Sequence, residues 1–322
     1  MIRTYAAVEG HLHQIDAGAD AGRVVWFDLL SPNREEELRL QDSLGLELPS
    51  QEEMAEIEDS SRLYIENGIA FMTALLPAQV ESRDPILAPV TFVLGAGPLI
   101  TLRYHTPRAF DTFPQRATRA ETACADGASV LLSLLDAVVD RLADLLEACG
   151  RDVERLARDV FDKGAGSPGR QHDYREVLRG VGRLGRVSTM IQDSLVTIER
   201  LTTFLGPVLD RYGIAKTCRP RLKALSRDAH FLTEHAAALS GKLGFLLDAT
   251  LGMISIEQNA IIKILSIAAA VFLPPTLIAS IYGMNFAAMP ELNSPWGYPL
   301  SVGLMVGSVL LTLWFFKSRG WL

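Results

Sequence analysis

Oxygen-bearing side chains recur on one face of the apolar C-terminal part of the chain. Steps of three, four or seven residues lead from Asp248 through Asn259 and Thr276 to Ser280. Because these steps average about 3.6 residues, the positions share one side of a helix. Carboxylate, amide and hydroxyl oxygens suit hard cations, which prefer oxygen ligands. We call this side of the helix the polar face. It also carries one small and two apolar residues, and its members are Asp248, Ser255, Asn259, Ile262, Ser266, Ala269, Leu273, Thr276 and Ser280.

Two arrangements explain such a face. Small and polar residues favour close packing between membrane helices, and they also suit the wall of a water-filled conduit. Two spans cannot enclose a conduit, so a pore requires several subunits that each contribute this face. In a pore, Asp248 and Asn259 offer oxygen ligands, while Ile262 and Leu273 form apolar rings that gate by dewetting. The residues alone leave both interpretations open.

The polar face ends at a short motif, Tyr282-Gly283-Met284-Asn285-Phe286. A glycine at this point predicts a helix C-cap, and converging helix C-termini favour a cation through their partial negative charge. Asn285 would add a ring of amide oxygens. Mg²⁺ loses its water reluctantly, so such a ring binds the hydrated ion through its water shell. Glu291, in the following loop, would raise the local cation concentration.

The polar face lies in a segment with the character of a membrane helix. Residues 264–281 and 292–316 contain no charged side chain. Each range holds an apolar stretch of roughly 18 residues or more, near the minimum for crossing about 30 Å of hydrocarbon. Lys263 precedes the first span, and Lys317 and Arg319 follow the second. The positive-inside rule therefore predicts cytoplasmic termini and an outward-facing loop. The first residues do not resemble a signal peptide.

The N-terminal part has the pattern of a mixed α/β domain. Residues 24–30 predict a buried strand, and Ser31-Pro32 predicts the N-cap and first turn of a Glu-rich helix. Two hairpins are expected, one turning at Asn67-Gly68 and one at residues 95–98.

From Gly127 onward the apolar spacing is helical. A break at 164–169 divides two helices, the second of which is expected to end near Phe204, before Gly206-Pro207. A last helix is expected from near Arg219 straight into the first span. We therefore predict an α/β cytosolic domain (1–125), a cytosolic helical hairpin (126–216), a stalk helix (217–260), a pore-lining first transmembrane helix (261–285), an outer loop (286–298), a second transmembrane helix (299–317) and a cytoplasmic tail (318–322).

The distribution of charge narrows the range of possible functions. The net charge of −7 argues against nucleic-acid binding. Residues 31–60 are acidic and the helices after Arg151 are Arg-rich, which indicates either solvated faces and interdomain ion pairs or carboxylates that bind regulatory Mg²⁺.

A membrane-anchored enzyme is the least supported class. The chain has no phosphate loop, nucleophile elbow or paired His ligands. The histidines at 11, 13, 230 and 235 have the pattern of ordinary surface residues. Cys124, Cys149 and Cys218 show no ligand spacing, and we expect isolated thiols in a reducing cytosol.

The C-terminal quarter resembles the CorA family of magnesium channels. The resemblance rests on Tyr282-Gly283-Met284-Asn285-Phe286, on Met289-Pro290-Glu291-Leu292, on the blocks 256–259 and 272–277, and on the closing Trp321-Leu322. It implies a homopentamer in a bacterial inner membrane, with the first span lining the pore and the second forming an outer ring. Gly303 and Gly307 supply a small-xxx-small pattern suited to that packing.

The resemblance also implies roles for single residues. Gly283, Met284 and Asn285 match the selectivity filter, and Asn259 and Thr276 match polar rings. Ile262, Leu265 and Leu273 match the apolar gate, and Asp248 matches an acidic ring at the cytoplasmic entrance. One position where relatives place a sensing carboxylate falls on Ala224, one turn from Asp228.

The implied cargo is Mg²⁺, with Co²⁺ and Ni²⁺ as similarly sized hydrated ions, gated by cytosolic Mg²⁺ and without an organic cofactor. The alternative is a Zn²⁺ transporter of the related zinc-transport branch. The Met289-Pro290-Glu291-Leu292 loop favours the magnesium branch, and the spans contain no Cys or His for soft-ligand zinc capture.

Overall fold

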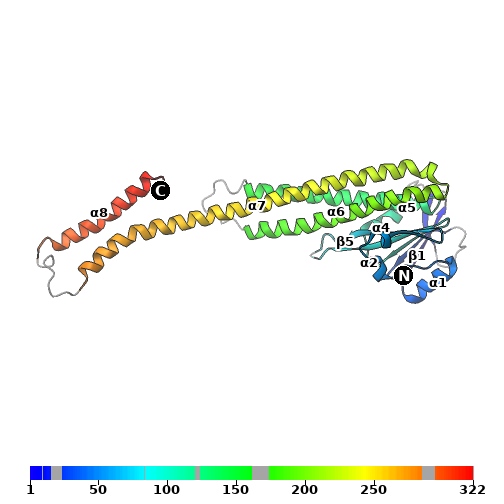
Figure 1. Cartoon of the computed structure of the whole chain (residues 1–322), viewed down its shortest axis with the longest axis horizontal. Coiled ribbons are helices and arrows are strands. Elements are labelled where there is room, and N and C mark those ends of the chain that lie inside the picture. The colour runs from blue at the N-terminus through cyan, green and yellow to red at the C-terminus, as the bar shows by residue number, and fades with distance from the viewer. Residues whose placement is uncertain are drawn as a thin grey trace. The chain divides into compact units, whose positions relative to one another are not determined.

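The computed structural model describes residues 1–8, 10–15, 24–82, 84–119, 124–161, 174–284 and 294–321. The chain divides into two compact units, Met1–Leu247 and Asp248–Leu322, which are described separately below. The expected fold class is confirmed: an α/β domain comes first, followed by long helices and two C-terminal transmembrane helices (Figure 1).

A seven-stranded mixed sheet forms the centre of the first unit. Its strand order is β2-β1-β3-β7-β6-β5-β4. Only the pair β3 and β7 is parallel among these neighbours. The strands are β1 (Ile2–Val8), β2 (His11–Ile15), β3 (Val24–Leu30), β4 (Leu63–Glu66), β5 (Ile69–Ala78), β6 (Ile86–Leu94) and β7 (Leu99–Arg103).

Both predicted hairpins are confirmed, as β4–β5 and β6–β7. Asn67 and Gly68 have φ values of 50° and 82°. Two consecutive positive φ angles are what a two-residue type I′ turn requires, and Asn-Gly tolerates them best. The predicted N-cap at Ser31 is wrong. Ser31 has φ 43°, whereas an N-cap needs extended backbone, and Asn33 caps α1 (Arg34–Leu44) through a capping box with Glu36.

Helices cover both faces of the sheet. Side chains alternate along each strand, so Met72 and Leu76 of β5 join the larger apolar cluster, while Phe71 joins the smaller one. The smaller cluster packs beneath α1 and α2 (Gln51–Ala55), with α3 (Asp59–Arg62) following. The larger cluster packs beneath α4 (Arg108–Arg119), α5 (Gly127–Phe161) and α6 (Tyr174–Arg211).

The long helices differ from the prediction at their ends. The predicted break at 164–169 lies outside the described residues. The predicted helix end near Phe204 is wrong, because α6 continues to Arg211 with Pro207 inside it. A proline within a helix costs about 3 kcal/mol. Val208 and Leu209 are buried just beyond it, and their burial offsets that cost.

The last long helix, α7 (Ala215–Tyr282), begins four residues before the predicted start near Arg219. In the first unit its buried residues follow steps of three, four or seven, which is the 3.5-residue period of coiled-coil packing. They join the cluster formed with α5 and α6. These residues are Cys218, Leu222, Leu225, Ala229, Ala236, Leu239, Leu243 and Leu246.

The second unit contains the rest of α7 and α8 (Gly297–Ser318). Both helices are long and apolar enough to cross a membrane. In α7 none of the most apolar stretch is buried, and in α8 only 6% is. A core helix of a soluble protein would be mostly covered, so the exposure of these two helices is that expected of transmembrane helices.

Candidate ion pathway

All residues of the polar face are placed by the structure, and all are exposed in the single subunit. Ile262 is 59% exposed and Leu273 is 72% exposed. Phe272, on another side of α7, is 70% exposed as well. One subunit therefore aligns the oxygen-bearing side chains but encloses no passage, and exposure alone does not distinguish this face from the rest of the helix.

The polar residues lie at separate levels along α7. A helix rises about 1.5 Å per residue, so Asn259 lies about 16 Å beyond Asp248, and Thr276 roughly 25 Å beyond Asn259. Leu273 lies one turn before Thr276. Leu265 is 69% exposed, but it is rotated by about 100° from Ser266 and so lies at the edge of the face.

Around Thr276 the helix offers several oxygen acceptors. The Thr276 hydroxyl donates to the Phe272 carbonyl at 2.7 Å, which leaves its own lone pairs free to accept. Pro274 and Pro275 have no N–H. The carbonyls of Ala270 and Val271, which such N–H groups would otherwise reach, therefore lack their usual helical donor.

The helix ends where the motif predicts. Tyr282 is the last residue of α7, and the Gly283 N–H donates to the Ala279 carbonyl at 2.9 Å. A Cβ on Gly283 would lie 3.0 Å from that carbonyl oxygen, so glycine is favoured here by a close approach. Gly283 is not among the described glycines with positive φ. Gly283 therefore ends the helix without the left-handed backbone that is common for a C-cap glycine.

The selectivity motif is placed only in part. Met284 is 45% exposed, directly after Gly283. Asn285 and Glu291 lie outside the described residues. The structure therefore puts two of the three predicted filter residues at the C-terminal end of α7, and the roles assigned to them stay predictions.

Carboxylates of the acidic segment 31–60 serve as local caps. Glu36 accepts from the Asn33 N–H and from the amino terminus at 2.8 Å, and the hydrogen bond with that ammonium group lowers the Glu36 pKa. Glu53 accepts from the Ser50 N–H. Among the described residues, no group of three or more His, Cys, Asp or Glu side chains is placed to hold a metal ion.

An acidic cluster in the first unit was not predicted from the sequence. Asp136 and Asp140 lie one turn apart on α5, and Asp228 of α7 acts on Asp140 electrostatically. Burial raises the Asp140 pKa, and the charge of Asp136 raises it further, while Arg116 opposes the shift. Arg221 pairs with Asp136 at 2.7 Å. The sequence shows the four-residue spacing of these two aspartates, which places them on one side of a helix. It does not show that they lie close to α7.

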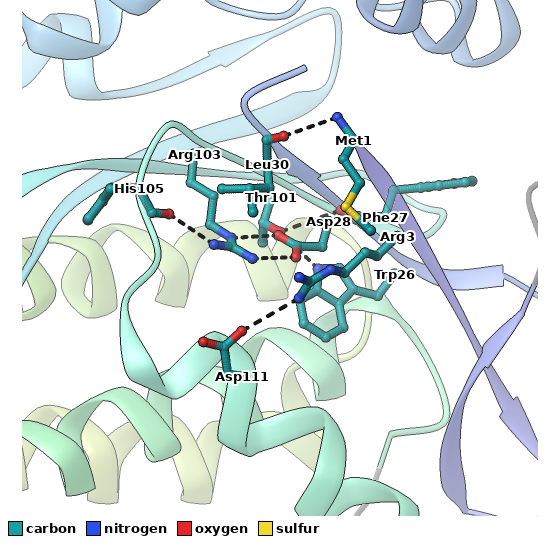
Figure 2. A network of polar contacts seen from close by, with 10 residues as sticks. All are labelled: Met1, Arg3, Trp26, Phe27, Asp28, Leu30, Thr101, Arg103, His105 and Asp111. Atoms are coloured by element: carbon teal, nitrogen blue, oxygen red, sulfur yellow. Dashed lines mark hydrogen bonds and ion pairs between the residues drawn. The ribbon is translucent and has the colours of Figure 1, made fainter. Parts of the chain in front are cut away.

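A buried ion pair joins the central strands (Figure 2). Asp28 of β3 and Arg103 of β7 have no exposed side-chain area, and Arg103 donates to both Asp28 oxygens at 2.9 and 2.7 Å. Thr101 also donates to Asp28, and the Trp26 indole donates to Thr101. Arg103 further donates to the His105 carbonyl. Because its partners are all internal, this network holds strands together and offers no open ligand site.

Cysteines and histidines carry no catalytic arrangement among the described residues. All three cysteines are free and buried, as expected for isolated thiols. Burial raises the pKa of the Cys149 thiol to about 11. His13, His230 and His235 are exposed as predicted, whereas His11 is half-buried. His230 lies 3.3 Å from a Glu199 oxygen across α6 and α7.

Comparisons with known proteins agree with this architecture. The chain is 33% identical to the magnesium transport protein CorA of Pasteurella multocida (strain Pm70) over 329 aligned positions, which cover 100% of both chains. The complete structure of the CorA magnesium transporter from Methanocaldococcus jannaschii matches with a TM-score of 0.77 at 20% identity, over 100% of this chain and 99% of that one.

The fold of the N-terminal part is also found in another solved structure. The ZntB cytoplasmic domain of Vibrio parahaemolyticus matches with a TM-score of 0.56 at 11% identity, over 78% of this chain and 96% of that one. The family description "CorA-like Mg2+ transporter protein" matches residues 21–318. By this match and the full-length identity, the chain belongs to the CorA-like Mg²⁺ transporter family.

Proposed function

We propose that this protein is a channel-type transporter that carries Mg²⁺ into the cell. One observation carries the proposal: in a chain of this family, oxygen-bearing residues align along an exposed face of a membrane helix that ends at Gly283-Met284. The proposed location is a bacterial inner membrane, with both termini in the cytoplasm. The basic residues Lys263, Lys317 and Arg319 at one end of the spans support that orientation.

The proposed assembly is a homopentamer in which each copy of α7 turns its polar face to a common axis. A single subunit leaves this face uncovered, and the hydroxyl groups that lie within the span would face lipid unfavourably in a lone helix. Several copies around an axis place those groups against water and leave the apolar sides of α7 and α8 to lipid. The five-fold number comes from resemblance to the family.

An inward-moving ion would meet the proposed rings in order. Glu291 attracts cations to the outer mouth, and Gly283, Met284 and Asn285 bind the hydrated ion at the filter. Within the span, Thr276 offers hydroxyl oxygens. The apolar gate of Leu273, Leu265 and Ile262 follows, and Asn259 and Asp248 form the cytoplasmic exit.

The membrane potential drives the proposed influx. Moving one charge through 100 mV is worth about 2.3 kcal/mol, so a divalent ion gains about twice that. A filter that recognises the water shell takes Co²⁺ and Ni²⁺ as well as Mg²⁺, because their hydrated ions are of similar size. No organic cofactor enters this process. Cytosolic Mg²⁺ bound between subunits is proposed to hold the gate closed, with its loss allowing opening.

The second candidate is Zn²⁺ transport. It follows from the resemblance to the related zinc-transport branch of the family. The described part of both spans contains no Cys or His, which are the usual zinc ligands in proteins besides carboxylates. Uptake assays with both ions rank the candidates directly, because Zn²⁺ uptake without Mg²⁺ uptake would reverse the order.

The decisive experiment is Mg²⁺ flux into liposomes that carry the wild type or Asn285→Ala. We expect the variant to lose most of the flux and its preference for Mg²⁺ over Ca²⁺, since the amide oxygens that hold the water shell are gone. Asn293→Ala, in the same outer loop, is the matched control and should keep both. Normal flux and selectivity in Asn285→Ala would remove the central role of that residue.

A further inference from the structure

The C-terminal half of α8 carries a shallow apolar groove that ends in a positive charge. The groove is lined by Leu310, Leu313, Trp314 and Lys317. Leu310 is 62% exposed and Trp314 is 68% exposed. These residues follow helical steps of three and four, so they form a continuous strip along one side of the helix. The strip has the length of about two helical turns and runs toward the end of the span.

Lys317 differs from the other two basic side chains at this end. The Lys263 ammonium lies 5.8 Å from the Trp321 ring centre, and the Arg319 guanidinium lies 5.7 Å from that of Phe315. For Lys317 no ring contact, ion pair or side-chain hydrogen bond is recorded among the described residues. Within the described part of the chain, its cation therefore stands at the end of an apolar strip without a protein partner.

Carboxylates that could pair with Lys317 are scarce in this unit. Its described residues include only Asp248 and Glu257 as acids, and both precede Lys263 in α7. Glu257 lies six residues, or about 9 Å, before Lys263. Each additional copy of the chain in an assembly would add its own Lys263, Lys317 and Arg319 at the same end of the spans. An anion from outside the protein would offset this repulsion.

We infer that this strip binds an anionic phospholipid, with an acyl chain against Leu310, Leu313 and Trp314 and the phosphate at Lys317. The flexible stem of a lysine can follow apolar surface while its ammonium reaches the headgroup level. Basic groups at the membrane surface attract anionic headgroups, and the apolar strip matches a lipid tail. The inference goes beyond the proposed function and does not depend on which ion is carried.

A second copy of the chain is the competing occupant. Gly303 and Gly307 continue the same side of α8 toward its other end, and a Cβ on either would meet nothing within 4 Å in this subunit. A helix that packs on such a small-xxx-small pair crosses at about 40°. It therefore diverges from α8 by the level of Trp314, which leaves the strip open to lipid.

The fluorescence of Trp314 can show which molecule lies against the strip. We would measure quenching of the full-length protein's fluorescence by brominated phosphatidylglycerol and by brominated phosphatidylcholine in bilayers. Trp296→Phe and Trp321→Phe leave Trp314 as the only tryptophan of the membrane unit and keep an aromatic ring for Lys263. Trp26 is buried in the other unit. One cation near the surface predicts about a five-fold preference for the anionic lipid.

Variants separate the charge from the groove. Lys317→Gln should reduce the preference to near parity, and Lys317→Arg should restore it. Arg319→Gln is the matched control and should keep it, because that guanidinium already lies over Phe315. Leu310→Ala should weaken quenching by both lipids, whereas Leu311→Ala, equally exposed but outside the groove, should not.

Several outcomes would overturn the inference. Equal quenching by the two lipids, or a preference that survives Lys317→Gln, removes the phosphate contact. No quenching by either lipid means that protein covers the strip. Loss of the preference in excess inorganic phosphate means that the site takes free anions instead of lipid. Flux in pure phosphatidylcholine tests transport separately, so the two proposals can fail independently.

Discussion

The two units of this chain bury their side chains in opposite ways. In Met1–Leu247 the apolar residues form two internal clusters, and even a full ion pair is satisfied inside. In Asp248–Leu322 the described residues include no fully buried hydrophobic side chain. The first unit buries its apolar residues within itself, whereas the described apolar side chains of the second unit stay partly or fully exposed in the single subunit.

This difference predicts where substitutions change stability and where they change transport. A buried residue of the first unit acts through the free energy of unfolding, with little direct effect on an ion. An exposed residue of the second unit touches its surroundings in the assembly, so its replacement should alter flux while the subunit stays folded. The four tests below examine this division.

The largest effect is expected from Arg103→Met. It leaves the Asp28 carboxylate buried without its partner, which typically costs about 3–5 kcal/mol of folding free energy. Denaturant unfolding of the full-length protein, followed by near-ultraviolet circular dichroism, measures the loss. Arg108→Met is the control, because its pair with Glu81 is exposed and should contribute less than about 1 kcal/mol. Equal losses in both variants would contradict the structural role of the buried network.

A glycine pair tests the packing of the same unit. A Cβ on Gly127 would lie 2.6 Å from the Leu99 nitrogen and 2.7 Å from the Gly97 carbonyl oxygen. Gly127→Ala should therefore destabilise the domain by roughly 1–3 kcal/mol. Gly150, inside α5, has nothing within 4 Å of such a Cβ, so Gly150→Ala should stabilise by about 0.5–1 kcal/mol. The two changes should shift the melting temperature in opposite directions, and shifts of the same sign would refute the packing argument.

Leu273→Asn tests the membrane unit. Its side chain is 72% exposed in the subunit, so we expect little change in the stability of the first unit. A polar group in the proposed apolar gate ring would wet the constriction, so Mg²⁺ leak into liposomes with high internal Mg²⁺ should rise. Phe272→Asn, equally exposed on another side of α7, is the control. A leak of the same size in the control would show that Leu273 has no special place.

The smallest effect is expected from Asp140→Asn. Because burial raises the Asp140 pKa in the folded state, its negative charge destabilises the fold at neutral pH. This cost is complete above the folded pKa and disappears as the pH falls below the unfolded value of about 3.9. Asp140→Asn should thus raise the melting temperature slightly at pH 7, with the gain shrinking toward pH 4. A gain that is independent of pH would point to a cause other than charge.

Short sequence patterns predicted the structural features that depend only on neighbouring residues. The Asn67-Gly68 turn follows from the φ angles those residues tolerate, and the two spans follow from uninterrupted apolar composition. The polar face of α7 follows from helical periodicity alone. Ser31 and Asn33 show the limit of such reasoning, because both residue types suit an N-cap and only the backbone of Ser31, which donates its N–H to the Arg103 carbonyl, decides between them.

Features that depend on distant partners could not be predicted. Asp28 and Arg103 are 75 positions apart, and no local pattern links them. Pro207 indicates a helix end, but the burial of the residues after it keeps α6 intact. The polar face itself can be predicted from one chain, whereas the common axis that we propose for it involves several chains, so the ion pathway rests on resemblance and on the tests above.

The adjacent prolines of α7 have a mechanical consequence. With no N–H at Pro274 and Pro275, the two carbonyls opposite them are already without helical donors, so widening that side of the helix breaks no further bond there. Elsewhere in the part of α7 after Asp248 the same bend would stretch intact hydrogen bonds. Flexion is thus cheapest immediately beside Leu273, so a small tilt would leave that side chain near the pivot and displace most the residues that lie farthest beyond it, toward Tyr282.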